Sequence, residues 1–167
     1  MENQFLQNTQ KKVKEWREGG YKGIEKETEN ILAHIKRVGF LHSPQIEALE
    51  TYIYLKEVAG NKPSGEIFRT LFADEREMLL ALVSKDKAFD LIGDTKAIDK
   101  LIEERFGKSD YVNQVYALTM GSGKTILMAT MCLYDFVLAY YHPDDKRFAK
   151  NALVFAPDTT IIESLKE

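Results

Sequence analysis

The run MGSGKT, residues 120–125, constrains the fold of this 167-residue chain more than any other feature. It follows a β-rich segment, YVNQVYAL (111–118), and precedes an apolar stretch, ILMATMCLYDFVLAYY (126–141). A strand, a glycine-rich turn and a long helix in this order predict the start of a parallel α/β sheet. A second buried strand is predicted at NALVFAPD (151–158), followed by the beginning of a helix at 159–167.

The first part of the chain has a different pattern. Apolar residues recur there at helical spacing, between glycines and polar caps that mark helix ends. The predicted organisation is therefore α/β, with a helical N-terminal region at 1–107 and the first strands and helices of a P-loop domain at 108–167. The segments predicted to be helical in the first region are 5–18, 24–38, 43–59, 66–84 and 95–107.

Composition excludes several classes of protein. The net charge of −3 gives no bulk electrostatic footprint for nucleic acid, although a local basic groove stays open. The only cysteine is Cys132, which excludes a disulfide framework and fits a reducing cytoplasm. The longest apolar stretch is short for a membrane span and contains Asp135, so we expect a buried helix and no membrane partner.

The glycine-rich run has the groups that a triphosphate requires. Gly121 and Gly123 permit a turn with backbone N–H groups directed into one concavity, at the positive end of a helix. Lys124 supplies an ammonium for the β- and γ-phosphates and is the predicted catalytic residue, and Thr125 supplies a hydroxyl for Mg²⁺. ATP and Mg²⁺ are the predicted cofactors, and the predicted binding residues of the loop are Thr119, Met120, Gly121, Ser122, Gly123, Lys124 and Thr125. The alternative is a glycine-rich turn whose lysine and threonine are solvated.

The loop departs from the common consensus at Leu118, where G-x-x-x-x-G-K-[ST] requires glycine. A loop of this kind, with GSGKT, resembles motif I of superfamily-two DEAD/DEAH-box helicases, and within them the Res subunit of type III restriction enzymes. Three stretches carry the resemblance: LTMGSGKTILMAT (118–130), DDKRFAKNALVFAPDTTIIESL (144–165) and SPQIEALETYIYLKE (43–57).

The resemblance implies a RecA-like domain and a function. The chain would be the N-terminal, ATP-binding part of a DNA helicase or translocase, in which ATP hydrolysis drives movement on DNA. It would be the front piece of a longer motor, and a modification subunit is a possible further partner.

The resemblance also implies roles for single residues. Gln45 would read the adenine edge, and the alternative is a surface or capping glutamine. Pro157, Thr159 and Thr160 would contact the nucleic-acid backbone, and the alternative is an ordinary helix cap.

One part expected of such an ATPase is missing from the sequence. Hydrolysis needs an acid pair after a hydrophobic strand. Asp74-Glu75 and Asp144-Asp145 lack that setting, so we expect this chain alone to hydrolyse ATP inefficiently. An alternative function is a non-catalytic helical module that binds a partner and carries an incidental P-loop. A small P-loop kinase or GTPase is a third hypothesis.

Overall fold

The fold is built from helices. The computed structural model describes residues 2–72, 74–108, 111–119 and 121–155, and within these ranges it contains no strand. The prediction of an α/β fold with a parallel, RecA-like sheet is therefore wrong, and the described part of the chain is all-helical.

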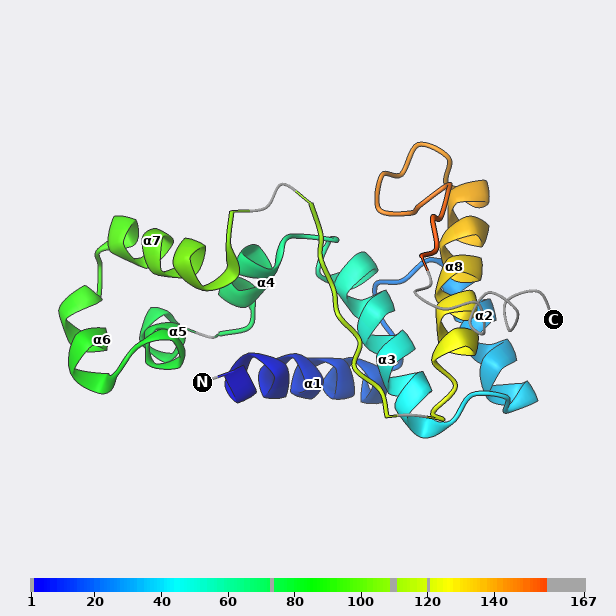
Figure 1. Ribbon diagram of the computed structural model, residues 1–167, viewed down its shortest axis with the longest axis horizontal. Coiled ribbons are helices and arrows are strands. Elements are labelled where there is room, and N and C mark those ends of the chain that lie inside the picture. Colours follow the sequence, from blue (N-terminus) through cyan, green and yellow to red (C-terminus); the bar gives the residue numbers. More distant parts are fainter. Residues whose placement is uncertain (1, 73, 109–110, 120, 156–167) are drawn as a thin grey trace. The chain divides into compact units, whose positions relative to one another are not determined.

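Nine helices follow one another along the described chain (Figure 1). One of them, η1, is a π-helix that continues α3 without a break. Their bounds are α1 Glu2–Glu18, α2 Lys26–Val38, α3 Ser43–Ile53, η1 Tyr54–Val58, α4 Ser64–Thr70, α5 Glu75–Leu82, α6 Lys85–Leu91, α7 Thr95–Phe106 and α8 Lys124–Tyr141.

The helices form two compact units, each made of two chain segments. Unit 1 contains Met1–Lys22 and Ala59–Val115, and unit 2 contains Gly23–Val58 and Tyr116–Glu167. Each unit combines residues from well-separated parts of the sequence. The division predicted at residue 107 stays a prediction.

Unit 1 has an apolar core. Helices α5, α6 and α7 pack together, and α4 packs on α7 at Gly65, where a side chain would press against Ile102. Phe68 of α4 is 2% exposed, and its ring lies 4.9 Å from the ring of Phe106. The buried residues of this core are Phe68, Met78, Leu79, Ala81, Ala88, Ile98 and Ile102.

A single helix predicted over 66–84 is divided into α4 and α5. The division follows from Asp74, whose carboxylate accepts a hydrogen bond from the Glu77 backbone N–H at 2.8 Å. Aspartate competes for backbone N–H groups in this way and therefore favours the position before a helix over its interior.

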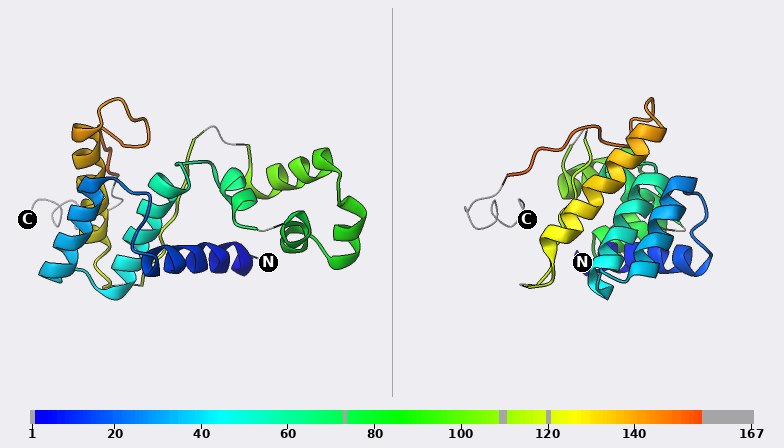
Figure 2. Two further views of the ribbon diagram at one scale, coloured as in Figure 1. Left: turned by 180° about the vertical axis from the view of Figure 1, so that it is seen from behind. Right: turned by 90° about the vertical axis from the view of Figure 1, so that its right-hand side faces the viewer.

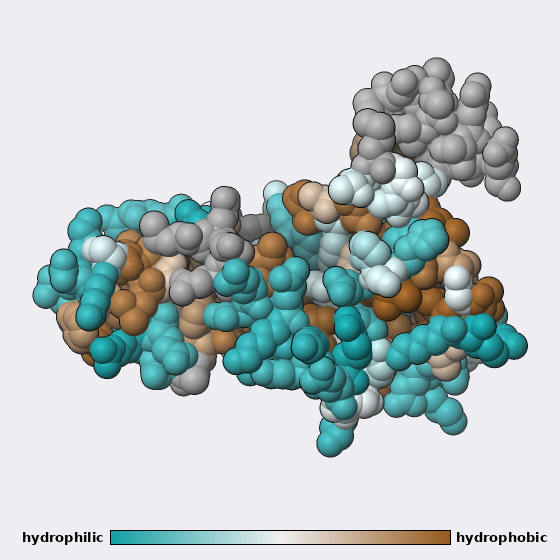
Figure 3. All heavy atoms as spheres, turned by 90° about the horizontal axis from the view of Figure 1, so that it is seen from below, coloured by the Kyte–Doolittle hydropathy of each residue, from teal (hydrophilic) through white to brown (hydrophobic). Residues whose placement is uncertain are grey.

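Unit 2 is organised around α8. Figures 1 and 2 show α2 and α3 beside it, and both helices contact it. Leu127, Tyr134 and Leu138 of α8 are buried, because they recur at helical spacing on the face toward these helices. The opposite face is apolar as well, and Leu133 and Tyr140 there are 59% and 80% exposed. In the space-filling view of Figure 3, apolar side chains (brown) lie at the surface among hydrophilic ones (teal).

The two predicted strands are not formed in the described residues. In segment 111–119 the side chains alternate between exposed and half-buried, which is the spacing of a strand with one buried face. Segment 151–155 is exposed throughout, with Phe155 85% exposed, and 156–158 lie outside the described residues. A strand requires a neighbouring strand for its backbone hydrogen bonds, and neither segment forms such a ladder. The prediction of two strands was therefore wrong in the described residues.

Candidate functional site

The predicted phosphate loop closes over the first residue of α8. Gly123 precedes the helix with a left-handed φ of 71°, and Gly121 has a φ of 76°, so glycine is required at both positions. The Lys124 ammonium donates hydrogen bonds to the carbonyls of Leu118 (2.9 Å) and Thr119 (2.6 Å). The Ser122 hydroxyl also donates to the Thr119 carbonyl, at 2.6 Å. The Lys124 ammonium thus lies against the backbone of the predicted phosphate loop.

Helix α3 holds this loop at two points. The Gln45 amide nitrogen donates to the Gly123 carbonyl at 2.9 Å, across 78 positions of sequence. About two turns further along the same face of α3, Tyr52 packs edge-on against Tyr116, which precedes the loop. A spacing of seven residues brings Gln45 and Tyr52 onto one face of α3, because two helical turns contain about seven residues. Burial raises the pKa of Tyr116 well above its usual value, so this tyrosine is a neutral packing residue.

The donors at the loop fit the phosphates of a nucleotide. An ammonium, a hydroxyl and the N-terminus of an 18-residue helix all favour a multiply charged anion. Mg²⁺ takes oxygen ligands and usually keeps several waters and substrate phosphates, so the Thr125 hydroxyl would supply one protein ligand. In the parts of the chain that the structure describes, no three His, Cys, Asp or Glu side chains come together as a metal site.

Neither acidic pair lies in a setting suited to hydrolysis. Asp74 caps α5, and the Glu75 carboxylate accepts from the Gly93 N–H at 2.6 Å. Asp144 and Asp145 follow the far end of α8, which at 1.5 Å per residue lies about 27 Å from Lys124. Asp145 is engaged by Arg147.

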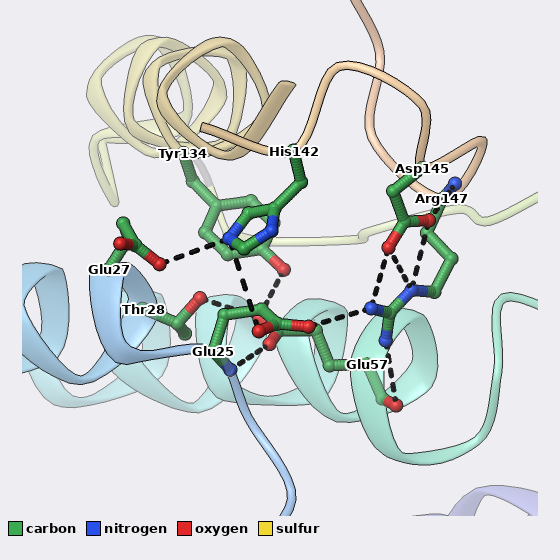
Figure 4. A network of polar contacts seen from close by, with 8 residues as sticks. All are labelled: Glu25, Glu27, Thr28, Glu57, Tyr134, His142, Asp145 and Arg147. Carbon is green, nitrogen blue, oxygen red and sulfur yellow. Dashed lines mark hydrogen bonds and ion pairs between the residues drawn. The ribbon is translucent and has the colours of Figure 1, made fainter. Parts of the chain in front are cut away.

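A buried network of polar side chains connects α2, η1 and α8 in unit 2 (Figure 4). At its centre is Glu57 of η1, 6% exposed. One of its carboxylate oxygens accepts from the hydroxyls of Thr28 and Tyr134, each at 2.6 Å. The other accepts from the Glu25 backbone N–H at 2.6 Å. These bonds join α2, η1 and α8, so every donor that Glu57 uses belongs to another segment.

A buried ion pair lies beside Glu57. The Lys56 ammonium contacts the Asp135 carboxylate, and both side chains are 8% exposed. The Tyr52 hydroxyl donates to the other oxygen of Asp135 at 2.6 Å. Burial lowers the pKa of Lys56, although the hydrogen bond that Lys56 donates to Asp135 opposes this shift. Desolvation and the bond to Asp135 raise the pKa of Tyr52 far above its usual range, so its hydroxyl keeps its proton.

The π-helix explains how both charges face inward. Three consecutive residues, Leu55, Lys56 and Glu57, are buried. In a regular α-helix they would spread over about 200° of the surface, since each residue advances by about 100°. A wider π-turn changes that spacing, and such turns are frequent at functional sites.

The rim of the network is more exposed. Arg147 donates to Asp145 at 2.7 Å and to Glu25 at 2.8 Å, and His142 lies 3.1 Å from Glu27. The hydrogen bond from Arg147 lowers the pKa of the Asp145 carboxyl. The hydrogen bond with His142 lowers the pKa of the Glu27 carboxyl. These contacts fasten the loop after α8 to the start of α2.

The structure brings Gln45 to the loop. Its side-chain amide bonds to the Gly123 carbonyl and is buried, so it is not exposed to a base. Met120, Pro157, Thr159 and Thr160 lie outside the described residues. The buried network was missed at the level of sequence. Part of its signal was available, because Asp135 is a lone acid in an apolar run.

Comparison with family models, with curated proteins and with solved structures gave no match. Across the described residues, every helix is too short or too polar to cross a membrane.

Proposed function

We propose that residues 118–125 bind the phosphates of ATP with Mg²⁺, as the ATP-binding segment of a cytoplasmic DNA helicase or translocase of the type III restriction class. One observation carries the proposal. The loop folds back so that the Lys124 ammonium meets two of its own carbonyls at the N-terminus of α8. An ammonium held by neutral carbonyls is available to a charged phosphate, because bonds between two charged partners are stronger.

The proposal assigns binding, not efficient turnover, to this chain. Lys124 would contact the β- and γ-phosphates, and Thr125 would hold the metal ion. Asp144-Asp145, the acidic pair of unit 2, follows the far end of α8 from the loop. The DNA, the movement along it and a modification subunit rest on the resemblance of the three sequence stretches alone.

A titration of a fluorescent ATP analogue with Mg²⁺ tests the proposal. Lys124→Ala should weaken binding about ten- to a hundredfold, the range for a hydrogen bond to a charged group. Lys146→Ala is the matched control, because Lys146 is an exposed lysine in the loop after α8. Equal affinities of Lys124→Ala and wild type, or no binding by wild type at millimolar ligand, would contradict the proposal.

A second candidate is a non-catalytic helical module that binds a partner. The absence of a strand from the described residues favours it, since the phosphate loops of ATPases normally connect a strand to a helix. Under this alternative neither the wild-type chain nor Lys124→Ala would bind the nucleotide.

A further inference from the structure

Gln45 occupies an enclosed position between α3 and the phosphate loop. Its side chain is 1% exposed. Its amide oxygen accepts from the His42 backbone N–H at 2.6 Å, and its amide nitrogen donates to the Gly123 carbonyl at 2.9 Å. Both ends of the amide are thus bonded to backbone, one at the start of α3 and one at the start of α8.

The bond to Gly123 fixes the direction of a peptide plane. The Gly123 carbonyl accepts from the Leu127 N–H at 3.1 Å as well as from Gln45. In a trans peptide, the C=O of one residue and the N–H of the next point in opposite directions. Holding the Gly123 carbonyl toward α3 and α8 therefore directs the Lys124 N–H outward from the helix start, toward the loop.

The glycine at 123 is matched to this glutamine. A Cβ atom at Gly123 would overlap the Gln45 amide nitrogen, whereas a Cβ atom at Gly121 would meet nothing. Both glycines have left-handed φ angles, so backbone conformation alone requires them equally. The close approach of Gln45 is the additional constraint, and it applies to Gly123 only.

Reading a base would require an accessible amide edge. A glutamine that recognises adenine offers an N–H and a carbonyl side by side to the ligand. At 1% exposure, Gln45 has no such surface, and its nitrogen is already committed to Gly123.

We infer that Gln45 is a positioning residue for phosphate binding, which acts through the Gly123–Lys124 peptide and does not recognise the base. The inference rests on the proposed function. It adds that α3 fixes the conformation of the loop before a nucleotide binds. Ligands with the same phosphates and different bases, or no base, should depend equally on Gln45.

Three competitors of the fluorescent ATP analogue separate the two roles: ATP, GTP and inorganic tripolyphosphate, each with Mg²⁺. Gln45→Glu keeps the acceptor for His42 and removes the donor to Gly123. It should weaken all three ligands by one common factor of about two- to tenfold, the effect of one hydrogen bond. Selective loss of ATP affinity would show that Gln45 reads adenine and overturn the inference. Unchanged affinity for all three would overturn it as well.

The failure of the inference is distinct from that of the proposed function. If wild type binds none of the three ligands, the proposed function fails and the inference with it. If wild type binds and Lys124→Ala does not, the site stands, and the pattern across the three ligands decides on Gln45 alone.

Two further measurements guard against a general loss of structure. The amide ¹⁵N–¹H resonance of Lys124 should move in ligand-free Gln45→Glu, while that of Lys146 stays in place. In a Gly123→Ala background, where the contact is already broken, Gln45→Glu should have no additional effect on affinity. Additive losses in that background would contradict action through Gly123.

Discussion

The two units bury different kinds of side chain. Unit 1 is filled by phenylalanine, leucine, isoleucine and methionine, and its only buried polar residue among those described is Thr9, which bonds the Phe5 carbonyl within α1. The described residues of unit 2 include seven buried polar or charged ones: Thr28, Gln45, Glu50, Lys56, Glu57, Thr130 and Asp135. An apolar core is held by area and shape, whereas a polar one is held by complete sets of partners. Within the described part of the chain, no buried side-chain polar atom lacks a partner, so unit 2 meets that demand.

The largest effect should come from breaking the charged core of unit 2. Asp135→Ala leaves the Lys56 ammonium buried without its counter-ion and the Tyr52 hydroxyl without its acceptor. Removing one partner of a buried pair costs about 3–5 kcal/mol. Urea unfolding followed by circular dichroism measures the loss, and hydrogen exchange should rise in peptides from 124–141.

The matched test removes the charges together. Lys56→Met, Asp135→Leu and Tyr52→Phe in one chain remove both charges of the pair together, and should recover most of the stability. A triple variant as unstable as Asp135→Ala would indicate that packing, not charge, holds this core.

Leu79→Ala in unit 1, where Leu79 is fully buried, should cost about 2–5 kcal/mol through the cavity it leaves.

A smaller effect compares two glycines, one in each unit. Gly123→Ala places a side chain against the Gln45 amide at a left-handed φ, and should cost about 1–2 kcal/mol for the backbone alone. Gly65→Ala in unit 1 meets the Cγ2 methyl of Ile102 at 3.0 Å, which must move by a few tenths of an ångström, and gains helix propensity of about 1 kcal/mol in return. Thermal unfolding should rank Gly123→Ala well below Gly65→Ala in stability, and the reverse order would contradict the close contact.

The smallest effect is a dependence of unit 2 on acid. The pKa values of the Glu27 and Asp145 carboxyls lie below their ordinary values because of hydrogen bonds with His142 and Arg147. A carboxyl whose folded pKa is lowered adds stability above its unfolded pKa, and that stability is lost as pH falls through the folded value. The unfolding temperature should therefore decrease as the pH falls below about 4. Asp145→Asn should reduce this dependence of the unfolding temperature on pH.

The rim carboxylates are partly exposed to solvent, so screening keeps the change in unfolding temperature small. Unit 1 supplies the contrast. Leu79→Ala changes no charge, so its loss of stability should be the same at pH 3.5 and pH 7. A pH-dependent cost of Leu79→Ala would place titrating groups near the apolar core.

Local features of the fold could be predicted from sequence, and pairings over long distances could not. The apolar spacing of α2 and α7 and the glycines that follow them gave correct helices, because propensity and capping act within a few residues. The single helix over 66–84 was wrong because the capping preference of Asp74 was overlooked. The sheet was wrong because an extended apolar segment is not a strand until another segment pairs with it.

The candidate site divides along the same line. The glycines, Lys124 and their turn were predictable, since they form one short stretch with defined backbone needs. The contact of Gln45 with Gly123 was expected only as proximity, and its partner was not foreseen. Lys56 and Asp135 lie 79 positions apart, and no local rule connects a lysine in one helix with an aspartate in another. The roles of Met120, Pro157, Thr159 and Thr160 stay predictions.

The wide turn at Tyr54–Val58 makes this region sensitive to a change in chain length. Loss of a single codon there would let the backbone continue as an ordinary α-helix, so helix formation by itself would not resist the deletion. The angular spacing within the turn would change, however, and with it the positions that direct the Lys56 and Glu57 side chains inward. Substitutions at the surface of η1 should thus be tolerated far better than the shortest possible deletion within it.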